Sequence, residues 1–263
     1  MPTTTTTIHD LKRMKQDGKP IPVLTCYDYT SAKILDSAQI PVLLVGDSLG
    51  MVVHGFSSTL PVTMEMMLHH CQAVARGAAH ALIVIDMPFA TYSVDDFRFS
   101  LKNCARALAE GGAHAVKIEG GSRVARLVAS LVAAGIPVMG HIGLTPQSIN
   151  QFGGYHIQGK DESSKKRLLA DALELESAGA FAIVLELVEH KLAAQITQRM
   201  KIPTIGIGSG PGCDGQVQVF HDVFGLYEDF VPKHTRRYAT LAETIRTAAK
   251  AYAADVAGRK FPN

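Results

Sequence analysis

The sequence predicts an α/β protein that folds as a single (β/α)8 TIM barrel with a short helical extension at its start. Short apolar segments alternate with amphipathic helical segments along the chain, about 20 to 40 residues per unit, which is typical of parallel strands joined by right-handed crossovers. The length of 263 residues is close to the roughly 250 of such barrels. Polar side chains follow many of the expected strands, which favours closure into a barrel over an open sheet.

Eight strands are expected from short apolar runs that Pro or Gly residues open or close. A run that is apolar on both faces is typical of a buried parallel strand. Ile-Pro-Val or Ile-Pro-Thr opens four of them, and Gly-Ala-x-Ala precedes two that end in a glutamate. In order, they lie at residues 21–26, 40–46, 81–85, 113–119, 136–140, 180–185, 202–207 and, more weakly, 216–220.

The helices between these strands are expected from apolar positions at helical spacing and from capping residues. Thr63 is expected to cap one helix, and Ser93 with Asp96 forms a capping-box-like pair before another. The loop at residues 50–61 is long enough to be functional, and residues 142–161 form the longest irregular segment. The expected helices cover residues 8–16, a stretch ending near 38, 64–74, 97–110, 124–131, 168–178, 192–196 and 241–256.

Composition excludes several classes of protein. The chain is 47% hydrophobic and 19% charged, and its net charge of +2 is too small to indicate a nucleic acid or an acidic membrane surface as partner. It contains no apolar run near the roughly 18 residues of a membrane span and no signal-peptide core at its start. We expect one domain over residues 1–263, with the Thr-rich residues 1–7 frayed. Four scattered cysteines without a C-x-x-C pair indicate free thiols in a reducing cytoplasm.

Polar residues gather at the carboxyl ends of five expected strands. In a barrel these strand ends surround one mouth, where such enzymes place their chemistry. Two of the residues, Lys117 and Glu119, are two positions apart on one strand and therefore point to the same face. The full set is Asp47, Ser48, Asp86, Lys117, Glu119, His141 and Glu186.

Four carboxylates that converge with one lysine require either protonation or a cation. Oxygen ligands without a Cys/His cluster suit Mg2+ better than Zn2+, and two or three carboxylates on the metal would leave another free as a general base. Each residue alone also has a structural interpretation: Asp47, Asp86 and Glu186 as helix caps, Glu119 with Lys117 as an ion pair, His141 as a satisfied core histidine. Their recurrence over five strands favours a functional site.

Two other patterns carry no site. Gly206-x-Gly208-x-Gly210 lacks the acidic residue and the clean helix start of a dinucleotide-binding loop, although its backbone N–H groups could approach a carboxylate or phosphate. His69 and His70 lie within one helix without partner ligands at suitable spacing, so we interpret them as non-metal residues.

Six motifs in order resemble the ketopantoate hydroxymethyltransferase family, over essentially residues 8–255. They include Val45-Gly-Asp-Ser-Leu-Gly-Met51 and Gly140-His-Ile-Gly-Leu-Thr-Pro-Gln147, and the others lie at 59–63, 86–89, 116–121 and 214–216. The resemblance implies a barrel of the phosphoenolpyruvate/pyruvate superfamily that adds the one-carbon unit of 5,10-methylenetetrahydrofolate to 3-methyl-2-oxobutanoate, which gives 2-dehydropantoate for pantothenate synthesis. It also implies a homodecamer.

The family pattern further implies a role for each matching residue. Asp47 and Asp86 are expected to bind Mg2+, with Glu119 as a third ligand, directly or through water. The oxo acid is expected to contact Ser48 and Lys117 as well as the two aspartates. Glu186 is the expected proton acceptor, whereas His141 is a candidate for the residues that support the ligands. Departures from the usual pattern are mild. Cys26 and Ser209 stand where alanine is usual, and the residue types at 232–235 also differ from the family pattern.

Two rival functions remain open at this point. A magnesium-dependent C–C lyase or mutase acting on a 2-oxo acid would use the same barrel and metal site, so a folate requirement must separate the two. A ligand-binding barrel without catalysis would not need Glu186. The apolar stripe of the last helix either packs on its own barrel or lies at a subunit boundary; its members are Leu241, Ile245, Ala248, Ala249, Tyr252 and Val256.

Overall fold

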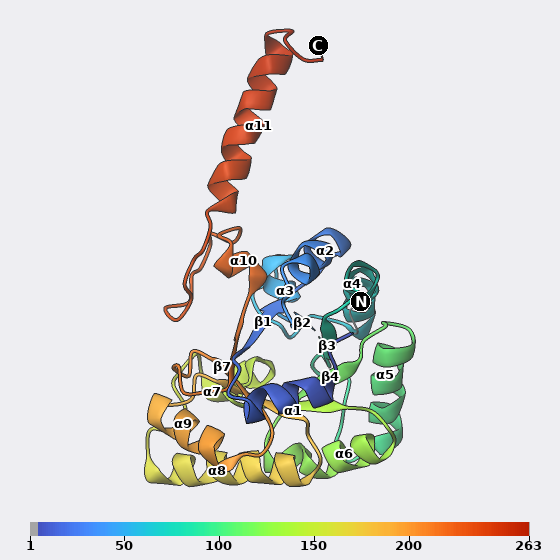
Figure 1. Cartoon of the computed structure of the whole chain (residues 1–263), viewed down its shortest axis with the longest axis vertical. Coiled ribbons are helices and arrows are strands. Elements are labelled where there is room, and N and C mark those ends of the chain that lie inside the picture. The colour runs from blue at the N-terminus through green and yellow to red at the C-terminus, as the bar shows by residue number, and fades with distance from the viewer. Residues whose placement is uncertain (1–4, 263) are drawn as a thin grey trace. The chain divides into compact units, whose positions relative to one another are not determined.

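A computed structural model describes residues 5–262 and confirms the barrel. Eight strands close in sequence order, and neighbouring strands pair in parallel, from Val23 opposite Val42 through to Gly206 opposite Gln216. Figure 1 shows the strands with helices around them. The strands are β1 (Ile21–Thr25), β2 (Val42–Val45), β3 (Leu82–Asp86), β4 (Ala115–Glu119), β5 (Val138–Gly143), β6 (Ala182–Glu186), β7 (Thr204–Ile207) and β8 (Gly215–Gln218).

Several helices begin at a residue whose side chain accepts a hydrogen bond from a free N–H group of the first turn. Thr63 caps α4 as expected, and Asp28 and Asp161 cap α2 and α8 in the same way. The helices are α1 (Ile8–Gln16), α2 (Tyr29–Ser37), α3 (Leu49–Val52), α4 (Met64–Gly77), α5 (Phe97–Ala109), α6 (Ser122–Ala133), the 3-10 turn η1 (Pro146–Ser148), α7 (Ile149–Phe152), α8 (Glu162–Ser177), α9 (His190–Arg199), α10 (Phe220–Val223) and α11 (Leu241–Ala257).

Three local expectations need correction. Asp96, not Ser93, caps α5, because the Ser93 N–H donates to the Ser100 hydroxyl instead of entering a capping box. The loop at residues 50–61 is partly helical, since α3 begins directly after Ser48. The last strand is shorter than expected and ends at Gln218, before the short helix α10.

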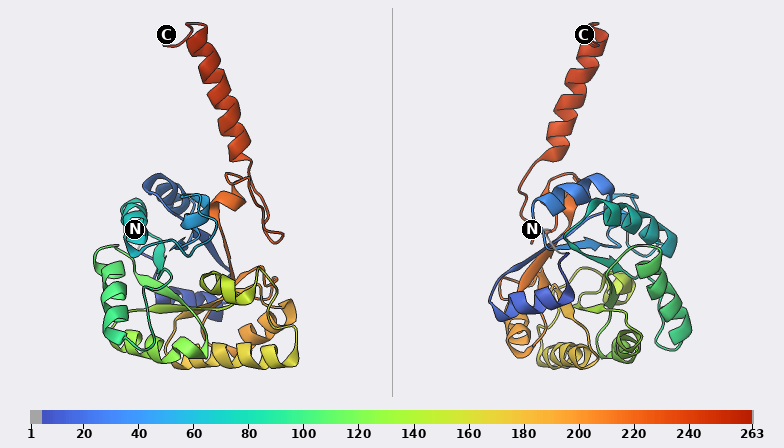
Figure 2. Two further views of the ribbon diagram at one scale, coloured as in Figure 1. Left: turned by 180° about the vertical axis from the view of Figure 1, so that it is seen from behind. Right: turned by 45° about the vertical axis from the view of Figure 1, so that its right-hand side comes forward.

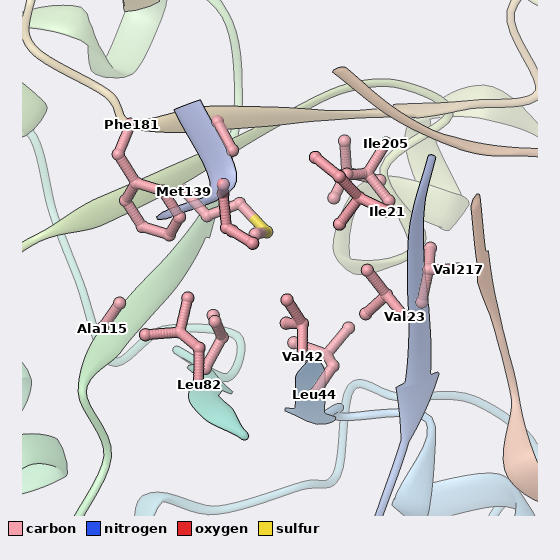
Figure 3. Close-up of a cluster of buried hydrophobic side chains, with 14 residues drawn as sticks. Ile21, Val23, Val42, Leu44, Leu82, Ala115, Met139, Phe181, Ile205 and Val217 are labelled. Carbon is pink, nitrogen blue, oxygen red and sulfur yellow. The ribbon is translucent and has the colours of Figure 1, made fainter. Parts of the chain in front are cut away.

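One alternate set of side chains from all eight strands fills the barrel interior (Figure 3). Since every second residue of a strand faces the same way, the next inward positions along each strand can be read directly. Leu82 and Val84 are followed by Asp86, Ala115 by Lys117 and Glu119, Met139 by His141, and Val184 by Glu186. The interior is therefore apolar at the amino ends of the strands and polar at their carboxyl ends.

Helix α1 packs on the apolar end of this interior through Leu11, which is fully buried. Lys15 on the same helix lies 2.7 Å from the Asp214 carboxylate and donates to the Thr197 carbonyl at 3.0 Å. Ahead of α1, Thr7 forms a capping box and Thr5 donates to the Ala79 carbonyl. The expectation of a frayed start therefore does not hold for residues 5–7, and residues 1–4 lie outside the described part.

The chain divides into two compact units, of which the first ends at Val217 and the second begins at Gln218. Within the second unit, backbone hydrogen bonds from Tyr238 to Val223 and from Leu241 to Phe224 join the segment before α11 to α10. No described residue of α11 is buried, and three members of its apolar stripe, Ile245, Tyr252 and Val256, are exposed. The single-domain expectation stays a prediction.

All four cysteines are free, and three of them are buried. Within residues 5–262, we find no helix with the length and apolar character required to cross a membrane.

Candidate active site

The polar end of the barrel brings the predicted site residues together. Five of them are buried, each no more than 5% exposed: Asp47, Asp86, Lys117, Glu119 and His141. The Glu186 side chain is 14% exposed, against 3% for the Glu119 side chain. The two glutamates, which end similar strands in the sequence, therefore differ in their access to solvent at the mouth.

The turn after β2 joins two of the carboxylates. The backbone N–H of Asp47 donates to Asp86 Oδ2 at 3.0 Å. A Cβ atom at Gly46 would lie 2.9 Å from Ser48 Oγ, so a larger residue there would displace the Ser48 hydroxyl. Ser48 makes no side-chain cap bond to α3, and its hydroxyl lies 2.9 Å from the Tyr27 hydroxyl. The Ser48 side chain is thus held beside Asp47 by Tyr27.

Lys117 is the positive group among these carboxylates. Its Nζ lies 3.0 Å from Asp86 Oδ1 and 2.8 Å from His141 Nδ1. Burial lowers the pKa of Lys117, but the charges of Asp86, Glu119 and Asp47 outweigh it, so the net shift is upward and the ammonium form is retained. An ammonium group can only donate, so His141 Nδ1 must accept and the imidazole proton must lie on Nε2.

His141 connects this lysine to the predicted base. Burial and the neighbouring Lys117 charge hold the pKa of His141 well below its usual range, so the ring is neutral. Its Nε2 lies 3.2 Å from Glu186 Oε2. Asp86, Lys117, His141 and Glu186 therefore form one continuous line of contacts across β3, β4, β5 and β6.

Burial and the neighbouring negative charges raise the pKa of two carboxyl groups at the site. Burial, followed by the charge of Asp86, raises the pKa of Asp47 to about 7, although Lys117 and Gln147 oppose the shift. Burial also raises the pKa of Glu119 well above its ordinary value; the Lys117 charge opposes this shift, and the charges of Asp47, Glu186 and Asp86 add to it. An additional cation would relieve both groups.

The donor set fits Mg2+. Within residues 5–262, no group of three or more His, Cys, Asp or Glu side chains forms a ready metal cage. Mg2+ does not require one, because it is usually held by one or two carboxylates together with water and ligand oxygens. Asp47 and Asp86 supply two adjacent carboxylates, and Glu119 Oε1 is a buried oxygen that accepts no hydrogen bond from the described residues.

Two further residues at this site, Gln147 and Tyr92, were not predicted from the sequence. Gln147 lies in η1, bonds to Asp47 and Glu119, and accepts a hydrogen bond from the Tyr92 hydroxyl. Gln147 is the last residue of the 140–147 motif, which was the available signal. Tyr92 has no comparable signal, since it lies in an irregular loop between β3 and α5.

Comparisons with known proteins agree on one family. The sequence model of ketopantoate hydroxymethyltransferase matches residues 5–263. A 3-methyl-2-oxobutanoate hydroxymethyltransferase of Chloroflexus aurantiacus is 56% identical over 97% of this chain and 90% of its own. One from Dehalococcoides mccartyi is 57% identical over 98% of this chain and 92% of its own.

Among solved structures, 2,3-dimethylmalate lyase, a member of the PEP mutase/isocitrate lyase superfamily, superposes with a TM-score of 0.60. It is 16% identical and covers 96% of this chain and 88% of its own, so this likeness concerns the fold.

Proposed function

The chain belongs to the ketopantoate hydroxymethyltransferase family, and from that premise we propose that it adds the one-carbon unit of 5,10-methylenetetrahydrofolate to 3-methyl-2-oxobutanoate. The product would be 2-dehydropantoate, for pantothenate synthesis. That the chain is a hydroxymethyltransferase follows from the family. The observation that carries the proposed chemistry is the convergence of Asp47, Asp86 and Lys117 with the more accessible Glu186 at one barrel mouth.

The proposed oxo-acid site lies among Asp47, Ser48, Asp86 and Lys117. Asp47 and Asp86 would hold Mg2+, with Glu119 as a third ligand directly or through water, and the ion would supply a Lewis acid that lowers the pKa of the substrate C3 proton. Lys117, buried and held in its ammonium form, places positive charge where negative charge develops on the 2-oxo oxygen. The Ser48 hydroxyl, held by Tyr27, is a hydrogen-bonding group for the acid.

Glu186 would remove the C3 proton. It ends β6 next to the mouth, and its side chain is 14% exposed, against 3% for that of Glu119. His141, whose ring is held by Lys117, places Nε2 3.2 Å from Glu186 Oε2, although this contact does not have hydrogen-bond geometry among the described residues. Removal of the proton leaves a carbon nucleophile at C3, which forms the new C–C bond with the methylene carbon of the folate. Over the whole reaction both C–N bonds of that carbon break, tetrahydrofolate leaves, and one water molecule supplies the hydroxyl group of the product.

A product assay with single omissions tests this function. 3-Methyl-2-oxobutanoate, 5,10-methylenetetrahydrofolate and Mg2+ together should yield 2-dehydropantoate, and omission of either the folate or the metal should stop its formation. A magnesium-dependent lyase or mutase would instead consume a 2-oxo acid without folate. That result would overturn the proposal and favour the rival.

We also propose that the protein works in the cytoplasm as a homo-oligomer, with a decamer as the family's pattern. The exposed apolar side chains of α11 support association, because apolar side chains gathered along one helix commonly mark an interaction surface.

A further inference from the structure

Gln147 forms hydrogen bonds with two of the proposed metal ligands. It lies in η1, is 6% exposed, and comes from a segment remote in sequence from its partners. Its backbone N–H donates to Glu119 Oε2 at 3.1 Å. Its side-chain Nε2 donates to Asp47 Oδ2 and to the Met87 carbonyl, both at 2.9 Å. One residue thus joins the ends of β2, β3 and β4.

The chemistry of the partners fixes the orientation of the amide. A carboxylate and a backbone carbonyl can only accept hydrogen bonds, so the NH2 group must face Asp47 and Met87. The remaining amide oxygen, Oε1, accepts from the Tyr92 hydroxyl at 3.0 Å. Two donors on one atom with an acceptor on the other are provided only by Gln or Asn, and Asn is one methylene shorter. The position therefore requires glutamine.

In each of the two carboxylates, Gln147 binds one oxygen and not the other. Gln147 occupies Oδ2 of Asp47 and Oε2 of Glu119. It leaves the other oxygen of each group, and Glu119 Oε1 is buried without a hydrogen-bond donor among the described residues. The two carboxylates are therefore held so that one oxygen of each is bonded to protein and the other is available to a cation or to water.

We propose that Gln147 is the positioning residue that presents Asp47 and Glu119 to the cation, an inference that rests on the magnesium site of the proposed function. Residues that hydrogen-bond to metal ligands fix ligand orientation, and their loss typically weakens metal binding by about 10- to 100-fold. Gln147 acts through the ligands and does not itself touch substrate. Its removal should therefore change the magnesium requirement more than the turnover rate.

Magnesium binding to the metal-free full-length protein tests this role by titration calorimetry in the presence of 3-methyl-2-oxobutanoate. Gln147→Met keeps the side-chain length and the backbone bond to Glu119 but removes the amide. Its magnesium dissociation constant should rise about 10- to 100-fold. In assays, kcat at saturating Mg2+ should recover toward the wild-type value. Gln72→Met, the same substitution at an exposed glutamine on α4, should bind Mg2+ as wild type does.

The outcomes separate this inference from the function on which it rests. A folded Gln147→Met protein that binds Mg2+ as tightly as wild type would overturn the role of Gln147 and leave the metal site standing. If wild type itself binds no Mg2+, the metal site and the role of Gln147 both fall. If Gln147→Met does not fold, Gln147→Asn, which withdraws the amide by one methylene, should show the same weakened binding; wild-type affinity there would equally overturn the role.

Discussion

Glu186→Gln isolates the proposed proton-transfer step from the rest of the reaction. The substitution preserves the size of the side chain and its ability to contact His141 Nε2, which lies 3.2 Å from Glu186 Oε2. It removes the basic carboxylate at the accessible end of β6. Proton abstraction from the oxo acid needs metal and base but no folate, so it can be followed alone as deuterium incorporation at C3 of 3-methyl-2-oxobutanoate in D2O.

The expected loss follows from what a well-placed base contributes. General bases accelerate proton transfer by about 10² to 10⁴, so exchange should slow by roughly 10² or more, equivalent to about 2.7 kcal/mol at the lower limit. Substrate affinity should change little, because Lys117 and the aspartates are untouched. Proton NMR of the C3 position measures the rate with Mg2+ present.

Glu174→Gln on α8 is the matched control, since this glutamate is exposed. Figure 2 shows α8, in yellow, among the helices outside the strands. The Glu174→Gln protein should exchange the C3 proton at the wild-type rate. Wild-type exchange by Glu186→Gln would refute Glu186 as the base, and His141 would be the next candidate.

Three further predictions concern the metal, acid stability and assembly. Chelation by EDTA should abolish turnover, and added Mg2+ should restore it; full activity of metal-free protein would exclude the proposed metal site. Asp36 accepts hydrogen bonds from the N–H groups of residues 79–81 and from His80 Nδ1, so Asp36→Asn should lower the free energy of unfolding at pH 7 by about 2 to 4 kcal/mol in urea titrations. Burial raises the pKa of Asp36, but the hydrogen-bond donors outweigh burial and the net shift of the pKa is downward. The stabilisation by the Asp36 carboxylate is therefore fully present above the unfolded pKa of about 3.9 and is lost as the pH falls through the folded pKa. The Asp36→Asn protein should not show this loss. Light scattering at micromolar concentration should give an assembly larger than a dimer, and a monomer-sized particle would contradict the assembly proposal.

The positions of the predicted site residues could be derived from sequence because the relevant patterns are local. The apolar run of β3 ends in Asp86, and Lys117 and Glu119 share the inward face of β4 by simple alternation. Parallel strands then bring these ends to one mouth without any knowledge of the contacts between them. The different exposure of Glu119 and Glu186 could not be derived, since it depends on how the loops above each strand are packed.

Contacts between remote segments account for what the sequence did not reveal. Gln147 bonds to Asp47 across 100 positions of the chain and to the Met87 carbonyl across 60. No periodic pattern or capping rule connects such residues. The cap of α5 was mispredicted for a more local reason: the Ser93 N–H donates to the Ser100 hydroxyl seven residues later, and Asp96 caps the helix.

Transfer of the methylene carbon itself tests the proposed function most directly. The protein is incubated with Mg2+, unlabelled 3-methyl-2-oxobutanoate and 5,10-methylenetetrahydrofolate that carries carbon-13 at its methylene position, and the product is examined by mass spectrometry. We expect 2-dehydropantoate that contains the labelled carbon in its new hydroxymethyl group, formed at a rate lower by roughly 10²-fold or more when Glu186 is replaced by Gln. Product without the label, or no product with all components present, would contradict one-carbon transfer by this active site.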